Sequence, residues 1–205
     1  MLAYSSISHA GYVLVGVQAA TQQGVESALF YLATYAFLVA GSFGVVTLVG
    51  RKGDGHHALD DYRGLGRTRP GLALVLAIFL FAQAGVPLTS GFFGKFYVIS
   101  AAVDAGSVGL AVVAMLAAVV AAFLYLRIVA SMYMSDETSS SSASSVSSSS
   151  SSESSSAGSV GRIAVPRTAG LALALCVIVT VGVGLWPGVI TEVTQDAVPV
   201  LSALG

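Results

Sequence analysis

Five long apolar runs restrict the fold of this chain more than any other feature. A helix needs roughly 20 apolar residues to cross a hydrocarbon core about 30 Å thick, because it rises about 1.5 Å per residue. Runs near or above that length lie at residues 1–20, 25–50, 71–103, 106–134 and 168–190. They lack the alternation typical of membrane β-strands. The sequence therefore predicts an all-α polytopic membrane protein with about five transmembrane helices.

The composition excludes several classes of protein. Hydrophobic residues make up 55% of the 205 residues and charged residues only 9%, whereas about a quarter of a soluble domain is charged. Nine basic residues face ten acidic ones, so nothing indicates a partner that is a nucleic acid. The single cysteine, Cys176, excludes an intrachain disulfide bond. The expected solvent is the lipid bilayer.

The charged residues predict how the chain is oriented, because Lys and Arg concentrate in cytoplasmic loops. Eight of the nine bases fall on one side of the predicted helices: Arg51, Lys52, Arg63, Arg67, Arg69, Arg127, Arg162 and Arg167. The other side holds only acids: Glu26, Asp104, Glu192 and Asp196. We therefore expect a multi-pass protein of a prokaryotic plasma membrane, with the N-terminus cytoplasmic and the C-terminus outside.

These features divide the chain into three parts. Residues 1–134 hold four helices with a cytoplasmic loop at 51–70, and residues 166–205 hold the fifth helix and a short outer tail. Between them lies the segment 135–165, most of which is a run of serines. This composition predicts a disordered cytoplasmic loop. A tolerated insertion is favoured there over a platform for phosphorylation. The first residues lack the basic start of a signal peptide, so none is expected. The first helix also lacks a polar flank, which favours a fragment or a mis-assigned start.

The loop at 51–70 contains residue types that can bind metal, namely His56, His57, Asp60 and Asp61. They lie among glycines and arginines, where solvated side chains are the usual explanation. No phosphate-binding loop, nucleophile–base pair or paired-cysteine motif accompanies them. We therefore predict neither a metal site nor a cofactor site in this chain.

Two predicted helices carry polar faces. In the first, offsets of three, four and seven place four residues on one face: Ser5, Ser8, His9 and Tyr12. In the second, the corresponding residues are Tyr31, Thr34, Tyr35 and Ser42. Such faces form hydrogen bonds between helices or border hydrated cavities. For His9 alone, hydrogen bonding between helices is favoured over proton relay.

The third predicted helix must be interrupted, because residues 71–103 would extend about 50 Å if straight. Pro87 removes a helical hydrogen bond, and three glycines near it permit irregular backbone and close approach: Gly85, Gly91 and Gly94. Lys95 follows eight residues after Pro87. An intramembrane lysine costs about 3 kcal/mol on insertion scales, and the outer boundary near Asp104 lies about 13 Å away. A functional role is therefore favoured over snorkelling.

Three motifs together resemble a known family. They are AYSSISHAGYVLVG in the first helix, DDYRGLGRTRP in the following loop and AGVPLTSGFFGKFYV in the third helix. They resemble the antiporter-like subunits of respiratory complex I, NADH-quinone oxidoreductase. The lysine after GFFG and the run YLATYAFLVAGSFGVV favour subunit N over subunits L and M.

The resemblance implies a fold of about fourteen helices in two inverted five-helix repeats, each with a broken helix, of which this chain holds the last five. It implies that Lys95 is the exit-side member of a row of proton-carrying residues and that His9 adjoins the row. The glutamate and two lysines that the family carries on earlier helices have no matching positions here. NADH, flavin, iron–sulfur clusters and quinone belong to other subunits, so this chain binds none, and its partners are the other membrane subunits of complex I.

The resemblance therefore implies a proton-translocating membrane subunit of NADH-quinone oxidoreductase, which couples electron transfer to quinone with proton pumping. It also implies that this chain performs no redox chemistry itself. Two alternatives remain open. One is the homologous subunit of a multisubunit Na⁺/H⁺ antiporter or a membrane-bound hydrogenase, and the other is a structural scaffold without conductance of its own.

Overall fold

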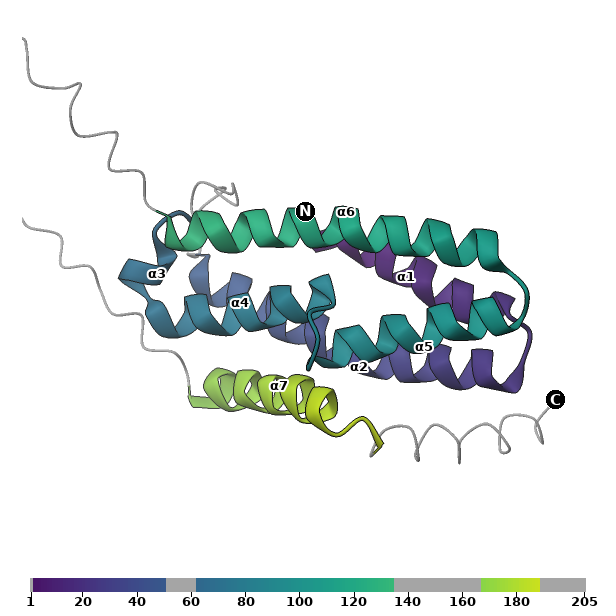
Figure 1. Cartoon of the computed structure of the whole chain (residues 1–205). Helices are drawn as coiled ribbons and strands as arrows, with labels where there is room; N and C mark the ends of the chain where they lie inside the picture. Colours follow the sequence, from purple (N-terminus) through teal and green to yellow (C-terminus); the bar gives the residue numbers. More distant parts are fainter. Residues whose placement is uncertain (1, 51–61, 135–166, 189–205) are drawn as a thin grey trace, which may run out of the picture.

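The computed structural model describes residues 2–50, 62–134 and 167–188. Across these residues the regular structure is helical and contains no strand, so the predicted all-α class is confirmed. The helices are α1 (Leu2–Gln18), α2 (Gln22–Val49), α3 (Leu65–Thr68), α4 (Pro70–Ala84), α5 (Ser90–Asp104), α6 (Val108–Tyr133) and α7 (Arg167–Leu185). Figure 1 shows an elongated bundle in which α4 and α5 follow one another along its length, with α6 on one side and α7 on the other.

The lengths of the helices fit a membrane protein. Within the described part of the chain, three helices are long and apolar enough to cross a bilayer: Gln22–Val49, Val108–Tyr133 and Thr168–Leu185. The apolar α4 has 15 residues and α5 has another 15. Because α4 ends at Ala84 and α5 begins at Ser90, the predicted break around Pro87 is confirmed.

A tight turn joins α1 to α2. The Thr21 side chain accepts a hydrogen bond from the Gly24 N–H at 3.0 Å and so caps the start of α2. The two helices then pack almost backbone to backbone, because a Cβ added at Gly24 would lie 2.4 Å from the Gly16 carbonyl oxygen. This contact holds the polar face of α1 against α2.

Two apolar clusters form the interior. One joins α2, α4, α6 and α7 around Phe79 and Leu80, and the other joins α1, α2, α5 and α6 around Val98 and Ala102. Phe79 lies directly against the backbone of α2, since a Cβ at Gly41 would come within 2.2 Å of its ring. The break between α4 and α5 therefore lies where the two clusters meet.

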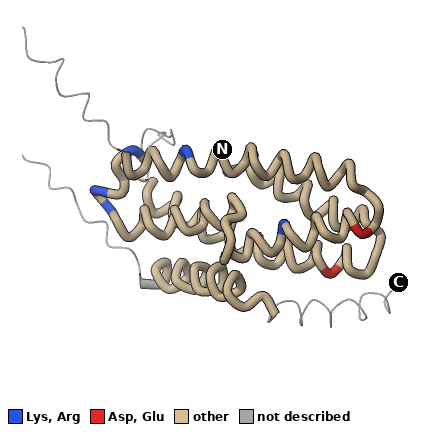
Figure 2. The backbone as a smooth tube through the Cα atoms, in the orientation of Figure 1, with Lys and Arg blue, Asp and Glu red and all other residues tan. Residues whose placement is uncertain are grey.

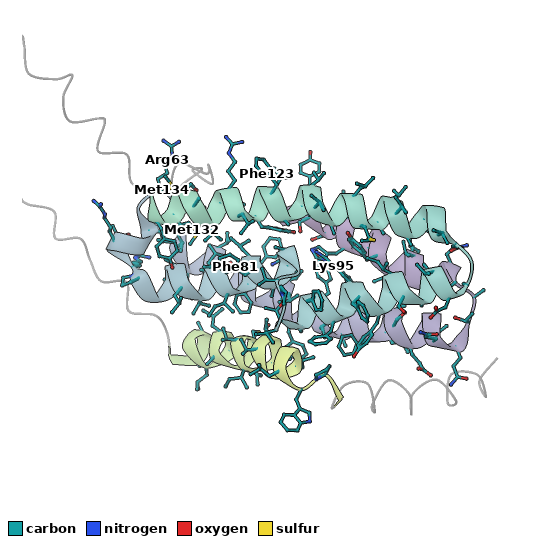
Figure 3. All side chains as sticks on the ribbon, viewed as in Figure 1. Arg63, Phe81, Lys95, Phe123, Met132 and Met134 are labelled. Atoms are coloured by element: carbon teal, nitrogen blue, oxygen red, sulfur yellow. The ribbon has the colours of Figure 1, made fainter. Side chains whose placement is uncertain are left out.

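Many large apolar side chains lie on the outer surface of the bundle. On α6, Val119 and Phe123 are 67% and 66% exposed, and Figure 3 shows Phe123 pointing away from the bundle. Contiguous exposed apolar surface of this kind marks a membrane or protein contact. Several polar side chains are instead buried between the helices, among them His9, Gln83 and Lys95.

Charged residues separate along the bundle as the sequence predicts. In the described part, Lys and Arg lie toward one end, Asp and Glu lie toward the other, and one basic residue lies between (Figure 2). That residue is Lys95, labelled near the middle of the bundle in Figure 3. The separation supports the expected orientation, whereas the side that faces the cytoplasm stays a prediction.

Cysteine labelling tests the predicted orientation. In a Cys176→Ala background, Thr68→Cys should react only with reagents that enter the cell, because Thr68 is exposed at the basic end. Gln22→Cys, exposed at the other end, should react with impermeant reagents. The Cys176→Ala protein without an added cysteine is the control. Labelling of Thr68→Cys by impermeant reagents would reverse the orientation.

Parts of several predictions lie outside the described residues. They are residues 51–61 of the loop, with His56, His57, Asp60 and Asp61, the serine-rich segment at 135–165, and residues 189–205 of the tail. Within the described end of the loop at 51–70, the structure contains the short helix α3, which was not predicted from the sequence. It begins after Gly64, whose φ of 69° is left-handed.

Candidate functional site

The break is built from backbone groups that leave the helical pattern. Gly85 adopts the left-handed conformation with φ of 91°, and the N–H groups of Gly85 and Val86 both donate to the Phe81 carbonyl at 3.1 Å. This motif closes the end of α4. Pro87 has no N–H, so it cannot donate to the carbonyl of Gln83, four residues earlier. That carbonyl is left free for another donor.

The start of α5 lies directly against the end of α4. An ideal Cβ at Gly91 would lie 1.9 Å from the Ala82 carbonyl oxygen, closer than real atoms approach. Farther along α5, a Cβ at Gly94 would lie 2.8 Å from the Tyr31 ring. The absence of side chains at these positions lets α5 pack against both α4 and α2.

Helix α7 packs against the segment between α4 and α5. A Cβ added at Gly184 would lie 2.2 Å from the Leu88 carbonyl oxygen. Leu88 has φ of 70°, a conformation that costs a side-chain-bearing residue roughly 1–2 kcal/mol. The Thr89 hydroxyl donates to the Val86 carbonyl at 2.6 Å within the same segment. Packing and local hydrogen bonds thus hold this irregular backbone in place.

The Lys95 side chain hydrogen-bonds to the end of α4. Its side chain is only 6% exposed, and its Nζ donates to the carbonyl oxygens of Gln83 at 2.7 Å and Ala84 at 3.1 Å. These are the last carbonyls of α4, where the helix dipole is negative and favours a cation. The Nζ also lies 5.5 Å from the centre of the Tyr12 ring, within range of a cation–π interaction.

His9 is the centre of a second polar group. It is 3% exposed, and its Nδ1 lies 2.7 Å from the Tyr31 hydroxyl while its Nε2 lies 3.3 Å from the Tyr125 hydroxyl. The Tyr125 hydroxyl also hydrogen-bonds to Ser5. The imidazole stacks on Tyr35 with 4.3 Å between ring centres. A neutral imidazole donates from one nitrogen and accepts at the other, so the two hydroxyls can satisfy both.

Tyr12 lies between the two polar groups. Its ring centre is 6.4 Å from that of His9 and 5.6 Å from that of Tyr31, on which it stacks. Its hydroxyl donates to the Ala114 carbonyl of α6 at 2.7 Å. Lys95 and His9 therefore belong to one buried polar region, to which α1, α2, α5 and α6 contribute.

Most of the predicted site residues meet in this region. Lys95, His9, Tyr12, Ser5 and Tyr35 are in contact with one another or with a shared partner. Ser8 is half-buried on α1 and takes part in none of these contacts.

Tyr125 and Gln83 are site residues that were not predicted from the sequence. Tyr125 is a hydroxyl-bearing residue within a long apolar helix, and Gln83 is the only amide between Gly71 and Lys95. A polar side chain within an otherwise apolar run is the signal that could have indicated either residue. In the described residues no group of three or more metal-ligating side chains occurs.

The amino-acid sequence matches a known family. Residues 1–146 match the family described as NADH:quinone oxidoreductase/Mrp antiporter, TM. The chain is 41% identical over 194 residues to NADH-quinone oxidoreductase subunit N 1 of Solibacter usitatus, covering 94% of the chain and 36% of the relative. It is 51% identical over 136 residues to subunit N 3 of Streptomyces griseus, covering 66% of the chain and 24% of the relative. The chain thus spans about a third or less of the length of these curated relatives.

Two solved complexes contain chains of similar fold. Respiratory complex I from Thermus thermophilus with bound Aureothin matches with a TM-score of 0.70 and 26% identity, over 93% of this chain and 38% of that one. The Mrp complex from Dietzia sp. DQ12-45-1b matches with a TM-score of 0.71 and 22% identity, over 96% of this chain and 41% of that one. The second likeness concerns the fold alone.

Proposed function

Because the chain belongs to the NADH:quinone oxidoreductase/Mrp antiporter transmembrane family, we propose that it forms a proton-translocating part of NADH-quinone oxidoreductase, equivalent to a segment of subunit N. Relatives named subunit N, between 36% and 51% identical, support this assignment. The observation that carries it is Lys95, a buried base held by the carbonyls that the broken helix leaves free.

Lys95 is placed to exchange a proton. Its charged form costs free energy in a low-dielectric interior, and the Gln83 and Ala84 carbonyls with the Tyr12 ring offset part of that cost. The neutral form needs no such compensation. Burial thus favours neutral Lys95, whereas the two carbonyls and the Tyr12 ring favour charged Lys95. Because these effects oppose one another, a change in a nearby charge can shift the proton on or off Nζ.

His9 extends the proposed pathway through hydrogen-bonded groups. An imidazole accepts a proton at one nitrogen and releases one from the other, and its two nitrogens face Tyr31 on α2 and Tyr125 on α6. Ser5 continues the hydrogen bonding from Tyr125. Discontinuous helices with polar groups at mid-depth are typical of such pathways.

The remaining assignments follow from the proposed complex. The partners are its other membrane subunits, and NADH, flavin, iron–sulfur clusters and quinone bind elsewhere in the assembly. The location is the plasma membrane of a prokaryote, with the N-terminus cytoplasmic and the C-terminus outside. The separation of charge along the bundle supports that orientation (Figure 2).

A sodium–proton antiporter subunit is the second candidate, because the family includes Mrp antiporters and the fold matches the Mrp complex. Affinity purification of the tagged chain from mild-detergent membranes separates the two. We expect flavin, iron–sulfur absorbance and NADH oxidation to co-purify with it. Membranes carrying the untagged chain are the control. Recovery of a membrane complex that exchanges Na⁺ for H⁺ and oxidises no NADH would overturn the assignment.

A further inference from the structure

Gln83 and Ser42 form a buried polar pair outside the His9 and Lys95 contacts. Each is 1% exposed. The Gln83 Nε2 on α4 donates to the Ser42 Oγ on α2 at 2.6 Å, and the Ser42 hydroxyl donates in turn to the Leu38 carbonyl at 2.8 Å. Because the hydroxyl hydrogen is committed to Leu38, Ser42 accepts from the amide. The direction of the hydrogen bond is therefore determined.

Burying this pair needs a reason, since apolar side chains of similar size would pack without a cost of desolvation. Gln83 is the next-to-last residue of α4. Its side chain is bound to α2 while its own carbonyl accepts from the Lys95 Nζ at 2.7 Å. Gln83 thus connects α2 to Lys95, since its side-chain amide binds Ser42 and its backbone carbonyl binds the Lys95 Nζ.

The Gln83–Ser42 hydrogen bond adds a side-chain attachment at the end of α4, beside the backbone hydrogen bonds of Gly85 and Val86 that close the helix. Helix termini fray readily, and here five residues outside any helix, 85–89, follow the last turn. Pro87 cannot donate to the Gln83 carbonyl, so the direction of that carbonyl depends on how the last turn is held. The Gln83–Ser42 hydrogen bond joins that turn to the long helix α2.

We propose that Gln83 and Ser42 are positioning residues, whose hydrogen bond keeps the last carbonyls of α4 aimed at Lys95. Neither residue carries the proton. This inference rests on the proposed role of Lys95 in proton translocation. If the Gln83 amide only attached α4 to α2, its loss would not change proton translocation by the assembled complex. We expect its loss to change translocation, because the amide also orients the carbonyls that bind Lys95.

The test compares proton translocation per electron in the assembled, reconstituted complex. Gln83→Met keeps an unbranched side chain without the amide, and Ser42→Ala removes the acceptor. Both should slow the proton step about five-fold, the factor expected from losing one ordinary hydrogen bond. The proton-to-electron ratio should then fall, because some electron transfer proceeds without the slowed proton step. The double variant should be no worse than either single variant. Ser42→Thr, which keeps the hydroxyl, should restore the ratio.

Ser27→Ala is the matched control, because Ser27 is also buried on α2 and donates to a carbonyl of its own helix, that of Gly24, at 2.8 Å. It should leave the ratio unchanged. Wild-type ratios in Gln83→Met and Ser42→Ala, additive losses in the double variant, or failure of both single variants to assemble would each overturn the positioning role. If Lys95→Ala also keeps the wild-type ratio, the proposed function fails. If Lys95→Ala loses translocation while Gln83→Met keeps it, only this inference fails.

Discussion

Lys95→Arg is expected to leave the complex assembled and to abolish most of the proton translocation that depends on this chain. A guanidinium group can donate to the same two carbonyls at the end of α4, so the charge and its hydrogen bonds persist. It does not release its proton at any pH the protein experiences. The measurement is the number of protons translocated per electron by reconstituted complex oxidising NADH.

Lys95→Ala should lose translocation as well, because no proton acceptor remains at the break. Lys52→Arg is the matched control, since Lys52 is the only other lysine in the chain and should tolerate the change. A Lys95→Arg complex that translocates protons at the wild-type ratio would identify Lys95 as a fixed charge. That result would favour the structural scaffold without conductance.

Gly91→Ala should prevent stable assembly of the chain. The added Cβ would meet the Ala82 carbonyl oxygen at 1.9 Å, and a backbone atom cannot rotate away as a side chain can. Relief requires α5 to move off α4, which costs about 3 kcal/mol or more, at or above the usual range for overpacking. The amount of chain recovered in the membrane and in the intact complex measures the effect.

Gly184→Ala and Gly182→Ala provide a matched pair on α7. A Cβ at Gly184 would lie 2.2 Å from the Leu88 carbonyl oxygen, whereas a Cβ at Gly182 meets nothing within 4 Å. We expect the first change to reduce assembly and the second to leave it intact.

For Gly91→Ala, recovery of the chain at the wild-type level would mean that α5 does not lie against α4 as described.

Much of the fold follows from local properties of the sequence. The length of an apolar run relates directly to bilayer thickness, which is why the long helices could be predicted. Pro87 and Gly85 act on the backbone within one helical turn, so the break between α4 and α5 was predictable too. The cost of an intramembrane charge likewise makes Lys95 a candidate site residue from the sequence alone.

The candidate site was only partly predictable, because helical periodicity states which residues share a face and not what that face meets. It grouped Ser5, His9 and Tyr12 on α1, yet the hydroxyl of Tyr125, which hydrogen-bonds to two of them, comes from α6. That contact spans more than a hundred residues of sequence. No local pattern encodes it.

The partners of Lys95 were decided by tertiary structure alone. The sequence predicts that the helix break leaves carbonyls free and that the buried charge of Lys95 needs partners to offset its cost. Only the packing of α5 back against α4 brings the carbonyls of Gln83 and Ala84 to Nζ, and only the packing of α4 on α2 brings Gln83 to Ser42. The sequence by itself therefore determined where the long helices form and where one of them breaks, because those outcomes depend on neighbouring residues. The tertiary structure decided which polar groups meet, because those contacts depend on how whole helices pack.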